Sequence, residues 1–143
     1  MKRTATWATP QSLFQSIPRR TERAFDQAMR VAKAEARVNE IGRAVEREVL
    51  RSGFSVVRAL CGHGIGRTIH EAPTVPNFTD VTSRERLTSG LVITVEPIIA
   101  MGAGRCATAK DGWTERTVDG SLAAHFEHTV VITDRAPILL TAA

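Results

Sequence analysis

The sequence predicts an α+β fold in which a helical segment precedes a mostly antiparallel sheet. Between residues 21 and 51 apolar side chains recur at helical spacing, with Arg, Glu and Lys between them. After Gly53 the chain changes to short runs rich in Val and Ile, bounded by Gly and Pro. Because the chain has 143 residues, we expect one compact domain. No apolar run approaches the roughly 18 residues that a membrane span needs, so we expect no membrane partner.

Residues 1–20 are expected to form an irregular leader, because they contain Pro10 and Pro18 and show no steady periodicity. They carry basic, Ser and Thr residues but no acid, which is also typical of an organellar transit peptide. A disordered leader is the preferred interpretation, and residues 21–143 form the predicted domain. Thr21 is the predicted N-cap, and Ser52-Gly53 supplies a helix stop. One long helix or two closely linked helices fit the pattern between them.

The second part of the chain is expected to consist of strands and loops. Residues 72–90 contain two prolines and a Ser-Gly pair and are predicted to form an extended connection. Residues 102–104 form a predicted turn. The predicted strands cover residues 54–60, 91–96, 113–118, 125–133 and 137–141.

The net charge of +4 is unevenly distributed. Residues 1–60 carry twelve Lys/Arg and six Asp/Glu, whereas residues 61–143 carry seven and nine. The basic half could meet nucleic acid or an acidic partner, but a solvated helix face is the preferred interpretation. Two cysteines, Cys61 and Cys106, show no paired spacing. This favours a reducing compartment, and hence the cytoplasm, over a disulfide-linked secreted protein.

The stretch CGHGIGRTIHE, residues 61–71, concentrates the chemically useful groups of the chain. Its histidines, His63 and His70, are separated by seven positions and lie among glycines that allow close backbone approach. Glu96 and Glu127 each lie in an apolar, strand-like run, where an unpartnered charge would be costly to bury. Together these four residues predict part of a metal site.

Strand alternation refines this prediction. On a strand over residues 125–133, His125 and Glu127 share one face, while Phe126 and His128 point to the other. Imidazole with several carboxylates suits Mn, Fe, Co or Zn. Two such ions can share an activated water and clamp a peptide carbonyl, which predicts metal-assisted amide hydrolysis.

Three blocks carry a family resemblance: GHGIGRTIHEAPTVPN, LTSGLVITVEPII and DGWTERTVDGSLAAHFEHTVVIT. In order and spacing they resemble the C-terminal half of the catalytic domain of a type I methionine aminopeptidase, over about residues 39–141. The resemblance implies a partial, half pita-bread-like fold. It also implies a metalloaminopeptidase hydrolase that excises the N-terminal methionine of nascent proteins and peptides, with a metal-bound hydroxide attacking the first peptide carbonyl.

The resemblance also implies residue roles. His63, Glu96 and Glu127 would be metal ligands, with Glu127 bridging two ions of Co, Mn, Fe or Zn. Glu96 would also shuttle the proton, and His70 would hydrogen-bond the scissile amide. Trp113 would wall the methionine pocket. The substrate contacts implied by this resemblance are His70, Trp113, Cys61 and Ile69.

The chain departs from the family pattern in several places. The family site also uses two aspartates and a further histidine from its N-terminal half, whereas the only aspartate before His63 is Asp26 and no histidine precedes it. Three ligands therefore stand where five are expected. Ile69 replaces a commonly aromatic residue, and His125 replaces an amide. His125 is either a substitute ligand or, as preferred, a strand-face histidine with a local partner.

Three functional hypotheses remain open at this point. The chain is a partial methionine aminopeptidase, or a non-catalytic descendant that binds a partner such as the ribosome through its basic half. In the third hypothesis two copies associate as a homodimer, because half of a paired fold exposes apolar surface.

Overall fold

The computed structural model describes residues 10–142, with side chains described from residue 15 onward. Two helices come first, α1 (Pro10–Met29) and α2 (Val38–Arg51), so the interpretation as two closely linked helices is confirmed. Ten strands follow, and every strand pair is antiparallel, as expected for the α+β class. None of the helices in this described part is both long and apolar enough to cross a bilayer.

Helix α1 begins earlier than the sequence predicts. The expected irregular leader is wrong from Pro10 onward, since residues 10–20 belong to α1; residues 1–9 lie outside the described part. Thr21 is inside the helix and donates its hydroxyl proton to the carbonyl of Ile17 at 2.8 Å, so it is not an N-cap. Burial of Ile17 and Phe25, both 3% exposed, offsets the cost of about 3 kcal/mol that a helical proline such as Pro18 carries.

The end of α2 follows the sequence prediction. Helix α2 ends at Arg51, and the Ser52 amide donates to the carbonyl of Glu48 at 3.1 Å. Gly53 then adopts a left-handed φ of 78°, which glycine accepts without steric cost. At the other end of α2, the Arg37 amide donates to the Glu40 carboxylate at 2.9 Å, which satisfies a donor at the helix start.

The strands form three sheets. The three-stranded sheet has the order β1-β5-β8, the five-stranded sheet β10-β9-β4-β2-β3, and the two-stranded sheet β6-β7. The strands are β1 (Ser55–Val56), β2 (Gly62–Gly64), β3 (Glu71–Val75), β4 (Val92–Val95), β5 (Ile98–Ala100), β6 (Cys106–Thr108), β7 (Glu115–Thr117), β8 (Ala123–His125), β9 (His128–Val131) and β10 (Ile138–Leu139). Strand β3 lies where an extended connection was expected, because its residues pair with β2.

The larger sheets join where two paired segments break together. The strand expected over 91–96 gives way to β5 after Glu96-Pro97, and the strand expected over 125–133 is split into β8 and β9 around residues 126–127. Val95 pairs with His128 on one side of the break. Ile98 pairs with His125 on the other side. The break therefore brings Glu96 and Glu127 together.

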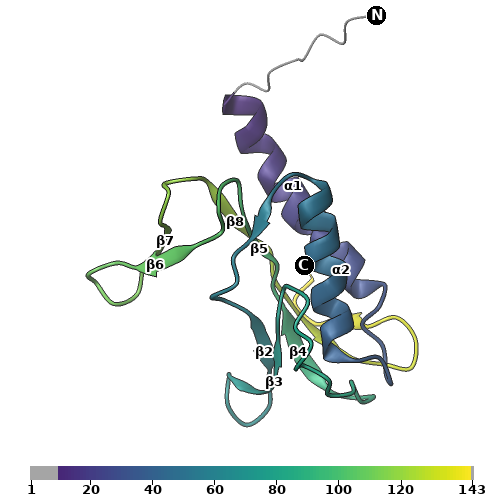
Figure 1. Cartoon of the computed structure of the whole chain (residues 1–143). Helices are drawn as coiled ribbons and strands as arrows, with labels where there is room; N and C mark the ends of the chain where they lie inside the picture. Colours follow the sequence, from purple (N-terminus) through teal and green to yellow (C-terminus); the bar gives the residue numbers. More distant parts are fainter. Residues whose placement is uncertain (1–9, 143) are drawn as a thin grey trace, which may run out of the picture.

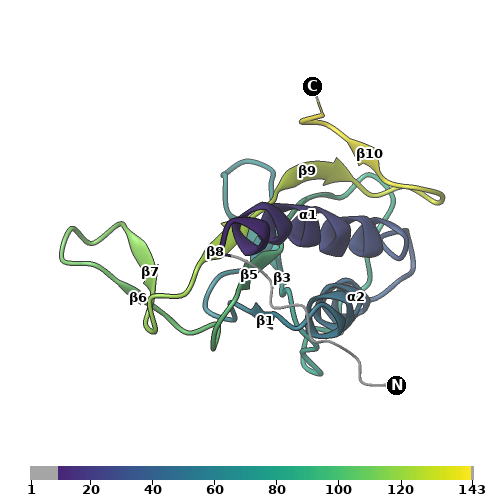
Figure 2. The same cartoon turned by 90° about the horizontal axis from the view of Figure 1, so that it is seen from above.

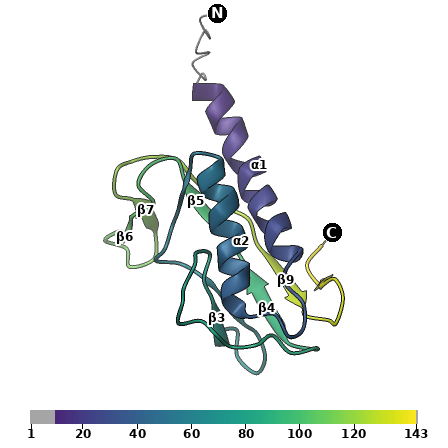
Figure 3. The same cartoon turned by 45° about the vertical axis from the view of Figure 1, so that its right-hand side comes forward.

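Both helices cover one face of these sheets (Figure 3). Phe25 of α1 makes edge contacts with the rings of Phe126, at 5.2 Å, and His128, at 5.3 Å. The core between helices and sheets is aliphatic, and its largest fully buried members are Ile41, Leu87, Ile93, Ile99, Ile132, Val38, Val45, Val49, Val75, Val95 and Val130. The β6–β7 hairpin extends away from this core (Figures 1 and 2).

Candidate metal centre

Strand β2 presents His63 between two glycines that pack tightly. A Cβ at Gly62 would overlap the backbone oxygen of Thr94, and one at Gly64 would overlap that of Ala72, so larger residues would push β2 away from its neighbours. The Nδ1 atom of His63 lies 3.0 Å from the carbonyl oxygen of Gly64. Because a carbonyl only accepts, Nδ1 carries the proton and the lone pair is on Nε2. Nε2 faces Oε1 of Glu96 at 3.8 Å, as a ligand nitrogen should.

Glu96 is held by groups from two other segments. The Thr94 hydroxyl donates to its Oε1 at 2.9 Å and accepts the amide proton of His63 at 2.9 Å. The side chain of Asn77, fully buried, donates to the Glu96 backbone carbonyl at 2.8 Å. The Glu96 side chain is only 12% exposed, and its ion pairs among the described residues are with His63 and His125. A carboxylate in this setting favours a cation close by.

His125 and Glu127 complete the cluster. Nε2 of His125 lies 3.6 Å from Oε2 of Glu96 and 3.5 Å from Oε2 of Glu127. One ligand atom from each of these three residues lies within 4.8 Å of the others. The Glu96 carboxylate raises the pKa of His125 against the opposing effect of burial, and the charge of Glu127 raises it further.

The predicted division of faces is confirmed. The rings of Phe126 and His128 contact Phe25 on the helix side, while His125 and Glu127 converge with Glu96. The alternation holds although residues 126–127 lie between strands, because the flanking residues His125 and His128 remain paired in the sheets. The cluster consequently lies on the face away from α1.

Other predicted site residues surround the cluster. The ring of His70 lies 4.2 Å, centroid to centroid, from that of His63. Burial raises the pKa of the Cys61 thiol, and the charge of Glu96 adds to this effect, so the thiol stays protonated at neutral pH. An open pocket of ≈ 440 Å³ is lined by Leu60, Cys61, His63, Ile69, His70, Glu96, Ile98, His125 and Glu127.

Trp113 is not part of this pocket. It lies in the turn between β6 and β7 with 88% of its surface exposed, and the pocket lining does not include it. The expectation that Trp113 walls a methionine pocket is therefore not supported by this structure. The physical reason is that the hairpin extends away from the sheets (Figure 1), so the indole has no packing surface opposite it.

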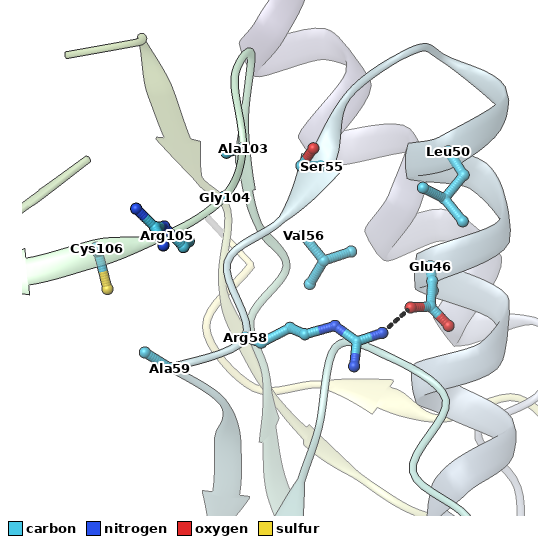
Figure 4. Close-up of a pocket in the computed structure, with 10 residues that line it drawn as sticks. All are labelled: Glu46, Leu50, Ser55, Val56, Arg58, Ala59, Ala103, Gly104, Arg105 and Cys106. Carbon is cyan, nitrogen blue, oxygen red and sulfur yellow. Dashed lines mark hydrogen bonds and ion pairs between the residues drawn. The ribbon is translucent and has the colours of Figure 1, made fainter. Parts of the chain in front are cut away.

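A second, larger pocket of ≈ 590 Å³ lies between α2, the segment around β1 and the start of β6 (Figure 4). Arg58 crosses it to pair with Glu46 at 2.7 Å and stacks on Phe78 with its guanidinium 4.5 Å from the ring centroid. None of the predicted site residues lines this pocket. Its charged groups already have partners, so the candidate chemistry belongs to the smaller pocket.

The donor set of the smaller pocket fits a divalent metal. Two carboxylates and the imidazole nitrogens of His63 and His125 are the ligand types that Zn, Mn, Fe and Co accept. The sequence predicted His63, Glu96 and Glu127, and the structure brings them into one pocket. Sequence reasoning missed Thr94 as the group that holds Glu96. The signal was available, because residues two apart on a strand share a face.

Comparisons with known proteins agree with this geometry. The metallopeptidase family M24 matches residues 1–134. The methionine aminopeptidase of Clostridium perfringens is 42% identical over 127 residues, which cover 89% of this chain and 51% of that protein. Methionine aminopeptidase 2 of Bacillus subtilis is 46% identical over 121 residues, covering 84% of this chain and 49% of the relative. The chain thus spans about half the length of these curated relatives.

Solved structures give the same result for the fold. The methionine aminopeptidase of Rickettsia prowazekii superposes with a TM-score of 0.86 at 34% identity, covering 91% of this chain and 53% of that one. The prolidase of Pyrococcus furiosus, at 23% identity and a TM-score of 0.71, shares the fold, with 34% of its chain covered. The half pita-bread-like fold expected from the sequence is confirmed. The chain belongs to the metallopeptidase family M24.

Proposed function

We propose that this chain forms one side of the active site of a metal-dependent aminopeptidase that removes the N-terminal methionine of proteins and peptides. The observation that carries the proposal is the convergence of His63, Glu96 and Glu127 in one pocket with His70 beside them. Family membership and relatives named methionine aminopeptidase support the substrate class.

Each residue has a role that its position supports. His63 and Glu127 would hold the metal, and Glu96 would hold it and move a proton between water and the leaving amine. A bound divalent ion would lower the pKa of water and polarise the peptide carbonyl. His70, whose ring adjoins His63, would hydrogen-bond the substrate amide and stabilise the developing negative charge.

The apolar part of the pocket is supplied by Leu60, Ile69 and Ile98. These aliphatic groups, with the protonated thiol of Cys61, suit a thioether side chain. We propose that they contact the substrate methionine from this half of the site.

Calorimetric titration with Mn²⁺, Co²⁺, Fe²⁺ or Zn²⁺, followed by methionine release from Met-Ala peptides, tests the proposal. We expect H63A and E127A to weaken metal binding at least tenfold. H70A should retain the metal and lose turnover, because its role is toward the substrate. Absence of both binding and turnover in the wild-type chain would reject catalysis by this chain alone, and equal metal loss in all three variants would refute the assigned roles.

Self-association is a second candidate function, favoured by the edge of the five-stranded sheet. Strand β10 forms that edge among the described residues, and Ile138 and Leu140 on and beside it are 55% and 54% exposed. An exposed apolar edge strand can pair with a second copy. Light scattering tests this, and a monomer at all concentrations would reject a homodimer.

The cellular setting forms part of the same proposal. Cys61 and Cys106 are free thiols, which suits the reducing cytoplasm, where nascent chains carry their initiator methionine. A basic N-terminal half would favour contact with the ribosome. Ribosome retention at low salt that is lost at moderate salt would support that contact, and no retention at low salt would exclude it.

A further inference from the structure

The cluster of Glu96, His125 and Glu127 has a property that the family resemblance does not provide. We propose that these three residues form a binding site for one divalent cation that is complete within this chain, with His125 as its nitrogen ligand. The proposal deepens the proposed metal-dependent function, on which it rests for the class of metal. It differs from that function in requiring neither the family's upstream ligands nor catalysis.

The separations of the donor atoms are those of ligands around one ion. Nε2 of His125 lies 3.6 Å from Oε2 of Glu96 and 3.5 Å from Oε2 of Glu127. Both distances exceed the range of about 2.7–3.2 Å for an N–H···O hydrogen bond. Ligands placed 2.0–2.2 Å from a tetrahedral zinc ion lie about 3.3–3.6 Å apart. The three side chains therefore need little movement to close on a cation.

The charge balance also calls for a cation at this position. Two carboxylates face each other across one imidazole, and the Glu96 side chain is 12% exposed. No Lys or Arg of the described part forms an ion pair with either carboxylate. A divalent ion with a neutral imidazole would bring the net charge of the cluster to zero, which lowers the cost of holding Glu96 largely out of water.

The surrounding structure positions the three ligands. Thr94 orients the Glu96 carboxylate through a hydrogen bond to Oε1, leaving Oε2 toward His125. His125 is fixed at the end of β8 by pairing with Ile98. Glu127 is 41% exposed, so it can adjust to the ion and the remaining positions can take water.

The ligand set selects the class of cation. One nitrogen and two carboxylate oxygens suit Zn²⁺, Co²⁺, Fe²⁺ or Mn²⁺. Ca²⁺ takes six to eight oxygen ligands and Mg²⁺ demands near-octahedral oxygen coordination, so both should bind this site weakly. The site is therefore expected to discriminate against the two commonest cellular divalent cations by ligand type.

Calorimetric titration of the metal-free full chain with Zn²⁺ tests the proposal, with Co²⁺ and its visible absorption as a second readout. The wild-type chain should bind one equivalent. H125Q, at a half-exposed position that tolerates the change, should weaken binding at least tenfold and alter the Co²⁺ spectrum. E127Q should weaken Zn²⁺ binding by a similar factor.

H128Q is the matched control, because His128 faces α1 and bonds Thr141 instead of the cluster; it should bind Zn²⁺ like the wild type. Circular dichroism checks that each variant is folded. Unchanged Zn²⁺ affinity and Co²⁺ spectrum in H125Q, or no binding by the wild type, would overturn the proposal.

The outcome is separable from that for the proposed function. Zn²⁺ binding that depends on His125, without methionine release, would uphold the cation site and reject autonomous catalysis. Methionine release with H125Q binding metal and turning over like the wild type would uphold catalysis and overturn the cation site.

Discussion

The hydroxyl of Thr94 is a single group on which two parts of the candidate site depend. It accepts the amide proton of His63 at 2.9 Å and donates its own proton to Glu96 at 2.9 Å. Thr94 is 2% exposed, so water cannot replace either bond readily. Substitution to Val keeps the shape and the β-branched character of the side chain while removing both bonds.

The expected loss of stability for T94V follows from these contacts. The bond from the His63 amide contributes about 1 kcal/mol, and the bond to the ionised Glu96 carboxylate contributes about 1.5–3 kcal/mol. The extra buried methyl returns about 0.8 kcal/mol. The free energy of unfolding should therefore fall by about 2–3 kcal/mol.

Urea unfolding followed by circular dichroism, with a chelator present, measures this difference in the metal-free protein. T129V is the matched control. Thr129 pairs with Thr94 across β4 and β9, and its hydroxyl makes no hydrogen bond with the part of the chain that the structure describes. T129V should stay within about 0.5 kcal/mol of the wild type. A T94V value indistinguishable from that of T129V would refute the argument that Thr94 holds His63 and Glu96 in place.

Two further predictions concern the packing and the electrostatics of the helices. F25A should lower the free energy of unfolding by about 3–5 kcal/mol, because Phe25 is 3% exposed and contacts two rings of the sheet; L50A, at a site 62% exposed, is the control in the same urea assay. Burial raises the pKa of Glu46, but hydrogen bonds from Thr79 and Arg58 outweigh it and leave this pKa lowered from 4.5. Because the folded-state pKa is depressed, its stabilising contribution is present above pH 4.5 and is lost as the pH falls through the lowered value. The deficit of E46Q relative to the wild type should therefore be clear at pH 7 and shrink at pH 3, and a deficit independent of pH would contradict this account.

Local sequence patterns were sufficient for much of the fold. Helical periodicity identified the two helices, and the Ser52-Gly53 stop matches the end of α2. The glycine pattern around His63 indicated close backbone approach, and the structure places Gly62 and Gly64 against neighbouring backbone oxygens. These features depend on the conformational limits of a few consecutive residues, so they can be derived without knowing the rest of the chain.

The errors arose where tertiary contacts outweigh local preference. Pro10 and Pro18 predicted an irregular leader, yet α1 includes both because its buried face packs against the sheets. Trp113 was assigned to the pocket from the resemblance alone, and the β6–β7 hairpin places it in solvent. Neither result follows from residues close to these positions in the sequence.

The sequence alone determined the types of ligand at the candidate site, since His63, Glu96 and Glu127 stand out by their chemistry and their apolar or glycine-rich surroundings. Only the tertiary structure decided that His125 joins them. Its partner Glu96 belongs to a distant segment, and strand register brings the two together through the pairing of Ile98 with His125. Register depends on hydrogen bonds between separate strands and on the core that fixes their faces, and no local pattern encodes it.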